Sequence, residues 1–357
     1  MSDRQVTPLA AREAISHAFS VGRPLFIWGP PGIGKSELIA DIARQNNAKL
    51  IDIRLSLWDP TDIKGLPYFN PDLKQMCWAP PFELPSEEDA TEYSQVVLFL
   101  DEMNSAAPAV QAAAYQLILN RRVGTYHLPD NVVIAAAGNR ESDRGVTYKM
   151  PAPLANRFVH IEMKTDFDEW FKWAIGNRIN SEVVGYLSCN KRDLFDFDPK
   201  GSGRAFATPR TWAFVSQLLD DNIGEKTLTD LVSGTVGEGL ALKFMAHRKH
   251  SKGMPTPEEV LEGKVKKLKG NVEISALYSL LISLCFELKE VSEKKPEKVW
   301  LSSVNNFFNF MMDNCEVELV VMACRVSIDQ YQLPFDPDQI DRFDEFHKKF
   351  GTYIMKA

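Results

Sequence analysis

Residues 25–36 have the sequence LFIWGPPGIGKS, a short apolar run followed by a glycine-rich segment that ends in Lys35 and Ser36. The segment satisfies the pattern G-x-x-x-x-G-K-[ST], and apolar residues at helical spacing follow it as far as Gln45. A strand before and a helix after are the context that this pattern needs in a phosphate-binding loop. Glycines let backbone N–H groups surround a polyphosphate, and the helix N-terminus adds partial positive charge. A Gly/Pro turn that fits the pattern by chance is disfavoured by both flanks.

The loop also predicts individual contacts. The Lys35 ammonium is placed to reach the β- and γ-phosphates, and the Ser36 hydroxyl is a ligand for Mg²⁺. The predicted nucleotide-binding residues are Gly29, Pro30, Pro31, Gly32, Ile33, Gly34, Lys35, Ser36 and Glu37.

Further strand-like segments lie on either side of helical ones in the first half of the chain. They are Lys49–Leu55 (KLIDIRL), Val96–Leu100 (VVLFL) and Val132–Ala137 (VVIAAA). Runs that are apolar on both faces are typical of a parallel sheet covered by helices. The alternation predicts a doubly wound α/β domain.

Past about Lys164 the pattern becomes helical. Helices are expected at Trp170–Ile179, Pro209–Leu219, Thr229–His247, Ile274–Leu288 and in much of Val304–Ile328. The polar stretch His250–Gly270 interrupts them, and the segment from Lys243 to Gly270 holds eight Lys or Arg against three Glu. A solvated linker is the main interpretation of this segment, and a basic contact for an acidic partner is the alternative.

Two neighbouring strands end in polar residues. Val96–Leu100 leads into Asp101 and Glu102, and Val132–Ala137 leads into Gly138 and Asn139. The ends of parallel strands beside a phosphate loop are where an α/β sheet places its chemistry. Asp101 would hold the Mg²⁺ shell, and Glu102 would orient or deprotonate an attacking water. Asn139 would bind that water or the γ-phosphate, with a turn-forming Gly-Asn pair as the alternative.

In this order GPPGIGKS, VVLFLDEMN, VVIAAAGN and APLANRF resemble the AAA+ ATPases, and specifically the MoxR family. The resemblance covers about residues 16–250. It implies ATP and Mg²⁺ as ligands, with Lys35 and Ser36 as Walker A and Asp101 and Glu102 as Walker B residues. Asn139 corresponds to sensor 1.

The resemblance also assigns two arginines. Arg157, in the sequence LANRF, corresponds to the arginine finger, which acts on the nucleotide of a neighbouring subunit. Arg210, in ATPR, corresponds to sensor 2 at the start of a lid helix. A nucleotide site completed by a neighbour implies a ring, usually a hexamer in this family. Pairing of Arg157 with an acidic neighbour and an ordinary helix position for Arg210 are the alternatives.

Two insertions resemble those of the helix-2-insert clade. Between the second strand and the acidic pair, Leu66–Phe69 and Lys74–Trp78 are expected to pair around the turn Asn70-Pro71-Asp72. Asn120–Asp130 (NRRVGTYHLPD) resembles the pre-sensor hairpin. Tyr126 and His127, near the tip of that hairpin, are candidates for substrate contact.

The sequence departs from the family in two places. Asn139 is followed by the charged loop Arg140–Arg144 where MoxR proteins commonly have a proline. A solvated loop is the main interpretation, and an additional contact of Arg140 or Arg144 with a neighbour is the alternative. Residues 271–357 extend beyond the usual lid. The predicted division is a core at 1–163 with an insert at about 56–85, a lid at 164–250, and a linker with a C-terminal helical extension at 251–357.

Composition narrows the functional classes. The chain has 357 residues and a net charge of −7, so it lacks the broad cationic face of a nucleic-acid-binding protein. The five scattered cysteines form no CxxC pair, which favours thiols in a reducing cytoplasm. No apolar leader begins the sequence, and the apolar stretch Ile274–Leu288 is too short for a bilayer. Neither a signal peptide nor a membrane role is expected.

The resulting hypothesis is an ATP-hydrolysing motor of MoxR type that remodels or matures a protein client as a ring. The resemblance suggests a von Willebrand A-type partner. Remodelling of nucleic-acid complexes, a P-loop phosphotransferase for a small molecule, and a scaffold gated by bound nucleotide are the alternatives. The adjacent carboxylates Asp101 and Glu102 disfavour the phosphotransferase, because a kinase must avoid activating water.

Overall fold

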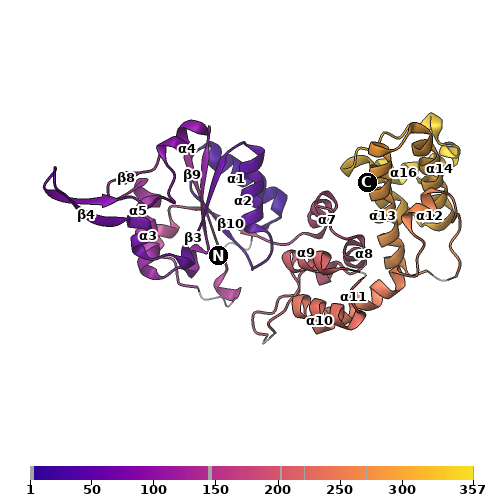
Figure 1. The fold of residues 1–357 in the computed structure, drawn as a ribbon, viewed down its shortest axis with the longest axis horizontal. Coiled ribbons are helices and arrows are strands. Elements are labelled where there is room, and N and C mark those ends of the chain that lie inside the picture. The colour runs from indigo at the N-terminus through magenta and orange to yellow at the C-terminus, as the bar shows by residue number, and fades with distance from the viewer. Residues whose placement is uncertain (1–3, 144–146, 202, 221, 271, 357) are drawn as a thin grey trace. The chain divides into compact units, whose positions relative to one another are not determined.

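The computed structural model describes residues 4–143, 147–201, 203–220, 222–270 and 272–356. The chain forms two compact units. The first comprises residues 1–169 with 198–201, and the second comprises residues 170–197 with 202–357. Each unit is described by itself below (Figure 1).

A six-stranded parallel sheet is the centre of the first unit. Its order is β1-β10-β2-β9-β6-β3, so strands distant in sequence are neighbours. The bounds are β1 Gln5–Val6, β2 Leu25–Trp28, β3 Lys49–Arg54, β6 Val96–Asp101, β9 Val132–Gly138 and β10 Val159–Met163. The four strands expected from apolar runs are confirmed. Strands β1 and β10 are additions, because β1 is very short and β10 contains His and Glu.

Helices cover both faces of this sheet (Figure 1). Helices α1 and α2 pack on one face, and α3 and α5 on the other. The helix bounds in this unit are α1 Pro8–Ser20, α2 Lys35–Gln45, α3 Pro60–Lys64, α4 Glu87–Glu92, α5 Pro108–Asn120 and α6 Ala152–Ala155. The architecture is the doubly wound P-loop fold that the sequence predicts.

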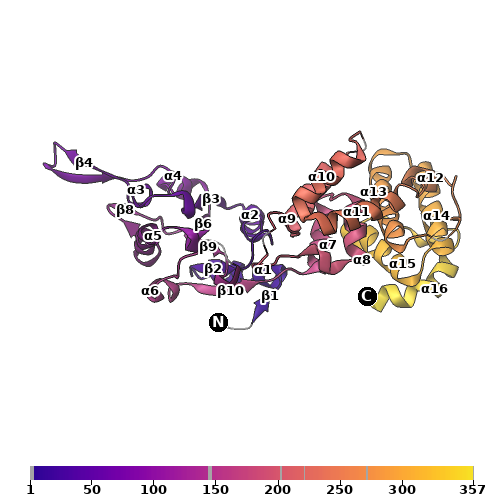
Figure 2. The same cartoon turned by 90° about the horizontal axis from the view of Figure 1, so that it is seen from below.

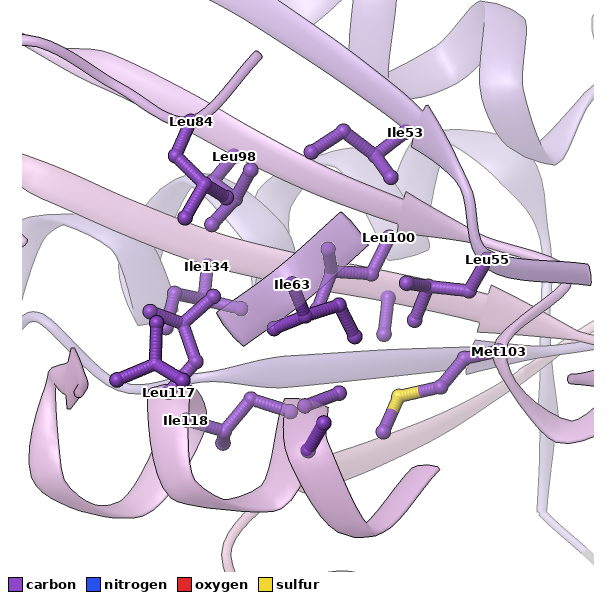
Figure 3. Close-up of a cluster of buried hydrophobic side chains, with 14 of the residues drawn as sticks. Ile53, Leu55, Ile63, Leu84, Leu98, Leu100, Met103, Leu117, Ile118 and Ile134 are labelled. Carbon is purple, nitrogen blue, oxygen red and sulfur yellow. The ribbon is translucent and has the colours of Figure 1, made fainter. Parts of the chain in front are cut away.

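The core on the α5 face holds the strand ends in place (Figure 3). Leu98 and Leu100 of β6 and Ile134 of β9 point toward helices α3 and α5. They meet Ile63 and Leu117, and all five residues are at most 2% exposed. This packing fixes the end of β6, where Asp101 and Glu102 begin.

Two antiparallel hairpins extend from the sheet. Strands β4 Leu66–Asn70 and β5 Gln75–Ala79 pair from Leu66 opposite Ala79 to Asn70 opposite Gln75, which confirms the expected insert hairpin. The shorter hairpin has β7 Arg122–Val123 and β8 Tyr126–His127, in the segment predicted to form the pre-sensor hairpin. The β4–β5 hairpin projects beyond α3 and α5 in both views (Figure 2).

The second unit is helical. Its bounds are α7 Phe167–Gly176, whose first turn belongs to the first unit, α8 Ser181–Cys189, α9 Pro209–Leu218, α10 Glu225–Val236, α11 Glu238–Ser251, α12 Pro257–Leu261, α13 Ile274–Lys294, α14 Glu297–Asn314, α15 Val317–Arg325 and α16 Phe343–Lys356. A π-helical turn at Val326–Gln330 follows α15. The division of this region at residue 250 stays a prediction.

Two sequence-based expectations for this unit were wrong. The single helix expected at Thr229–His247 is two helices, because Gly237 adopts a φ of 92° that no helix interior allows. The stretch expected as a solvated linker contains α12, whose Val260 and Leu261 are buried. Val260 and Leu261 are the only adjacent apolar pair in that polar segment, so periodicity gave no helical signal.

In the described part of the chain, no helix has the length and apolarity needed to cross a membrane. Helix α13 instead buries its apolar side chains within the second unit. All five cysteines are free thiols.

Candidate functional site

The glycine-rich loop connects β2 to α2 and has a backbone shape that only glycine supplies. Gly32 and Gly34 have φ values of 76° and 93°, in the left-handed region. At Gly29 a Cβ atom would lie 2.7 Å from the Ile33 side chain and 2.8 Å from the Met163 carbonyl oxygen. Gly34 is also the N-cap of α2 and offers no side chain, which leaves the first N–H groups of this helix available to an anion.

The Lys35 side chain lies inside the loop. Its ammonium donates to the carbonyl oxygens of Gly29 at 2.7 Å and Pro30 at 2.9 Å, and to Asn139 Oδ1 at 3.1 Å. The residue is 8% exposed. The lysine is therefore held between the loop and the end of β9, where its positive charge is close to any ligand of the loop.

Ser36 and Asp101 meet across the sheet edge. The Ser36 hydroxyl donates to Asp101 Oδ2 at 2.7 Å, although the two residues are 65 positions apart. A hydroxyl and a carboxylate are hard oxygen ligands, the type that Mg²⁺ takes together with water and phosphate oxygens. Among the described residues no group of three or more His, Cys, Asp or Glu side chains is arranged to hold a metal. The oxygen ligands of the Ser36–Asp101 pair are of the type that fits a Mg²⁺ ion also coordinated by a bound phosphate group.

Glu102 has an unusual backbone and two side-chain partners. Its φ of 53° and ψ of 31° are left-handed, a conformation uncommon for a residue other than glycine. The Ser56 hydroxyl donates to Glu102 Oε2 at 2.5 Å, and the Arg54 guanidinium lies 3.7 Å from Oε1. Strand β3 and the turn after it thus fix the orientation of this carboxylate.

Asn139 is positioned from beneath by Asn104. The Asn104 amide group is buried and donates to the Asn139 carbonyl oxygen at 2.7 Å. Its Oδ1 lies so close to Gly138 that a Cβ there would be 2.1 Å away, and this Oδ1 has no hydrogen-bond partner in the described chain. Gly138 is therefore needed for the close approach of β9 to Asn104.

Asp52, on β3, is close to the acidic pair. Asp52 is exposed overall, but partial desolvation by neighbouring atoms raises the pKa of its carboxyl group, and the nearby charge of Asp101 raises it further. Arg54 acts in the opposite direction. The strand ends therefore concentrate negative charge beside the phosphate loop. This charge arrangement favours a cation at the Ser36–Asp101 pair.

Ser56, Arg54 and Asn104 were missed from the sequence. Ser56 and Arg54 flank the end of the strand that neighbours β6, and Asn104 lies two positions after Glu102. Ser56 and Arg54 come close to Glu102 only because β3 lies beside β6 in the sheet.

The charged loop after Asn139 folds onto its own unit. The Arg140 guanidinium binds both carboxylate oxygens of Asp143 and also Glu162 Oε1 at 3.1 Å. These carboxylates hold the pKa of Arg140 above its usual range. Arg140 is thus paired within the chain, which disfavours the alternative of a contact with a neighbour. Arg144 lies outside the described residues.

The two arginines from the resemblance are both exposed. Arg157 follows α6 and forms neither a hydrogen bond nor an ion pair through its side chain with the part of the chain that the structure describes. The alternative that Arg157 pairs with an acidic neighbour is thus not realised there. Arg210 lies in the first turn of α9, in the second unit, between the two members of a capping box, Thr208 and Thr211. Their roles stay predictions.

Tyr126 is less accessible than a substrate-contacting residue should be. Its hydroxyl donates to the Pro85 carbonyl oxygen at 2.5 Å, and burial raises the pKa of the phenol. The neighbouring Thr125 hydroxyl donates to the Trp78 carbonyl oxygen at 3.3 Å. The β7–β8 hairpin therefore supports the base of the β4–β5 hairpin, while His127 remains exposed.

This geometry agrees with a match to a known family. Residues 25–165 match the model of the ATPase family associated with various cellular activities, AAA. The match begins with β2, includes the loop, Asp101, Glu102 and Asn139, and ends just after β10. Residues 25–165 therefore resemble an AAA ATPase domain and have its P-loop fold.

Individual relatives resemble the chain only distantly. Midasin of Giardia intestinalis is 25% identical over 193 residues, which are 50% of this chain and 4% of that protein. The chain thus corresponds to a small part of midasin. One solved structure, a point mutant of Thermotoga maritima RuvB, is 15% identical, with a TM-score of 0.40 over 85% of this chain and 90% of that chain.

A second Thermotoga maritima structure, the RuvB Holliday junction branch migration motor, is 16% identical. Its TM-score is 0.35 over 84% of this chain and 87% of that chain. Similarity at this level gives no information about the substrate of this chain.

Proposed function

We propose that the chain is a Mg²⁺-dependent AAA motor of MoxR type that hydrolyses ATP, works as a ring, and remodels or matures a client protein in the cytoplasm. One observation carries the proposal. Lys35, the Ser36–Asp101 pair, Glu102 and Asn139 converge at one edge of the sheet, directly beside the phosphate loop.

Each residue has a distinct part in hydrolysis. The loop amides and Lys35 bind the phosphates, and Ser36 and Asp101 would hold Mg²⁺, which supplies positive charge against the phosphate oxygens. Glu102 orients the attacking water and accepts its proton, since it is the carboxylate beside the metal pair that does not itself bond to Ser36. Asn139 bonds to Lys35 through its side chain and can turn that oxygen toward the water.

The exposed Arg157 supports the ring. A guanidinium with no partner in its own described chain is free to reach the phosphates of an adjacent copy, where it stabilises charge in the transition state. A ring of six subunits follows from the MoxR resemblance.

The β4–β5 hairpin is the better candidate for client contact than Tyr126. Its exposed large apolar side chains are Leu66, Tyr68, Phe69, Leu73, Met76 and Trp78, and Phe82 just after it is 98% exposed. Contiguous exposed apolar residues usually mark a contact surface. The proposed client is a protein, and a von Willebrand A-type partner is suggested by the family resemblance alone.

The test is the solution mass of the Glu102→Gln variant with and without Mg·ATP, measured by light scattering. The substitution keeps the shape of the side chain but removes the base, so ATP turnover should fall by about 100-fold or more while binding persists. We expect a shift from a small species to a ring of about six subunits in the presence of ATP.

Two matched variants complete the test. Lys35→Ala should abolish the mass shift by abolishing binding, and Arg157→Ala should bind ATP normally yet lose turnover. A Glu102→Gln protein that binds ATP and stays monomeric would contradict the ring. Phosphate transfer to a small molecule at an undiminished rate in Glu102→Gln would contradict the assignment of this residue as the base.

A further inference from the structure

Strand β3 is the last strand of the sheet, and one of its edges is unpaired. It pairs in parallel with β6 on one side. The Lys49 N–H donates to the Gln95 carbonyl oxygen, which places the odd-numbered residues of β3 in the ladder with β6. In a parallel pair the alternate residues direct both N–H and C=O to the other side. Leu50 and Asp52 therefore present two donors and two acceptors at the outer edge, and Arg54 presents a further donor.

These outward groups have no hydrogen-bond partner in the described chain. Natural proteins protect such an edge with a covering helix, a proline, a bulge or charged side chains. Strand β3 has charged side chains at Lys49, Asp52 and Arg54. Within β3 none of residues 49–54 is proline, and the strand pairs with β6 without interruption. The edge is therefore available for an additional strand.

A groove runs along this edge. Its volume is about 480 Å³, and it is lined by residues 50–54 of β3 together with Leu57, Trp58 and Glu83. Leu57 is 76% exposed. The groove thus combines unpaired backbone with apolar walls, the two features by which a sheet edge recognises an extended peptide.

The side chains of the groove indicate what that peptide carries. On one face of β3, Ile51 and Ile53 turn toward the core, next to Trp58. On the other face lie Leu50, Asp52 and Arg54, and Glu83 adds a second carboxylate to the lining. The one cation of the lining, Arg54, is already close to Glu102. The lining therefore combines apolar side chains with two carboxylates and one cation, which gives it a net negative charge.

We propose that the outer edge of β3 binds an extended segment of a partner protein, which adds to the sheet as a further strand. Apolar side chains of the segment alternate with Lys or Arg, so that one set contacts Ile51, Leu57 and Trp58 and the other faces Asp52 and Glu83. This binding requires no nucleotide, so it goes beyond the proposed motor activity and can fail without contradicting it.

The probe is a ten-residue peptide of alternating valine and lysine, titrated into the full chain without ATP by calorimetry. A counterpart with the same side chains but N-methylated backbone tests the hydrogen bonds, and an alternating valine–glutamate peptide tests the charge. Binding of the valine–lysine peptide is expected, weakened about tenfold or more in either counterpart, since each loses several hydrogen bonds or reverses the charge.

The Asp52→Pro variant provides the matched test on the protein. Its ring removes an outward N–H and covers the edge, while the ladder to β6 keeps all its bonds. Peptide binding should disappear. The Glu83→Lys variant, at an exposed position outside the strand, should weaken binding about fivefold through charge alone.

Three results would overturn the proposal. They are an absence of binding by the valine–lysine peptide, binding undiminished by N-methylation, and binding retained in Asp52→Pro. If Asp52→Pro is unfolded by circular dichroism, the Glu83→Lys variant and the two peptide counterparts decide the question.

Discussion

At the scale of single residues, the contact between Gly138 and Asn104 is the tightest in the site. The Gly138→Ala variant would place its new methyl group 2.1 Å from Asn104 Oδ1, so we expect a loss of about 1–3 kcal/mol in the free energy of unfolding. Adding Asn104→Ala removes the closest clashing atoms and leaves Phe26 Cζ, 2.9 Å from the new methyl group. The double variant should therefore be more stable than the sum of the two single effects predicts, by at least about 1 kcal/mol, in urea denaturation. Strict additivity would show that the two side-chain positions do not touch.

His247 makes stability depend on pH. It is buried between α8 and α13, where Ser275 bonds to Nδ1 and the Glu182 carbonyl oxygen lies 3.0 Å from Nε2. Burial lowers the pKa of His247 to about 4, from an ordinary value of 6.5. Between about pH 4 and pH 6.5, the imidazole is therefore protonated in the unfolded chain and neutral in the folded chain.

The free energy of unfolding should consequently fall as the pH drops from about 6.5 to about 4, by up to about 3 kcal/mol, and level off below that range. Denaturant unfolding across this range measures it. The His247→Gln variant should lose this part of the pH dependence, whereas His127→Gln, at an exposed position, should keep it. An unchanged profile in His247→Gln would show that another group is responsible.

At the scale of elements, neighbouring residues of β3 should tolerate proline very differently. Ile53 is buried and its N–H belongs to the ladder with β6, so Ile53→Pro should cost about 3 kcal/mol or more. Asp52→Pro removes an N–H that points outward and should cost about 1 kcal/mol or less. Thermal unfolding of the two variants compares them directly. Equal losses of stability would mean that the odd-numbered residues of β3 do not form the ladder with β6.

The sequence predicts elements well where one physical signal dominates. Strands β6 and β9 are buried on both faces and therefore form continuous apolar runs. Strand β10 mixes His and Glu with apolar residues, and β1 has only two residues, so neither has a pattern of its own. The break at Gly237 depends on a single φ angle, which composition does not report.

The residues of the site also differ in whether a local sequence pattern marks them. Lys35, Ser36, Asp101 and Glu102 belong to local motifs and could be found from spacing. Ser56 and Asn104 act through tertiary contacts with residues 46 and 35 positions away, so no local pattern marks them. In the proposed ring, the partners of Arg157 belong to another copy of the chain. A single sequence gives no information on contacts between copies.

At the scale of the whole molecule, the two compact units should respond differently to nucleotide. The phosphate loop and both carboxylates lie in the first unit, and each unit has its own buried core. A non-hydrolysable ATP analogue at about 100 times its Kd should stabilise the first unit by about 2.7 kcal/mol. Calorimetric melting should therefore show one transition moving upward with nucleotide.

The second transition tests Arg210. It should stay in place if nucleotide contacts only the first unit, and it should rise if Arg210 binds the phosphates as sensor 2. The Lys35→Ala variant is the control, since neither transition should then move. Loss of any rise in Arg210→Ala would assign that role to the arginine.

Trp28 offers a built-in optical reporter for the site. It is the last residue of β2, directly before Gly29, and its indole N–H donates to His160 Nδ1 at 2.9 Å. The two rings are stacked, with centroids 6.0 Å apart. Since indole emission responds to hydrogen bonding and to nearby rings, any movement of the phosphate loop that shifts Trp28 against His160 changes the colour or intensity of its fluorescence. The chain thus carries its own probe, without an attached dye, at the point where the loop begins.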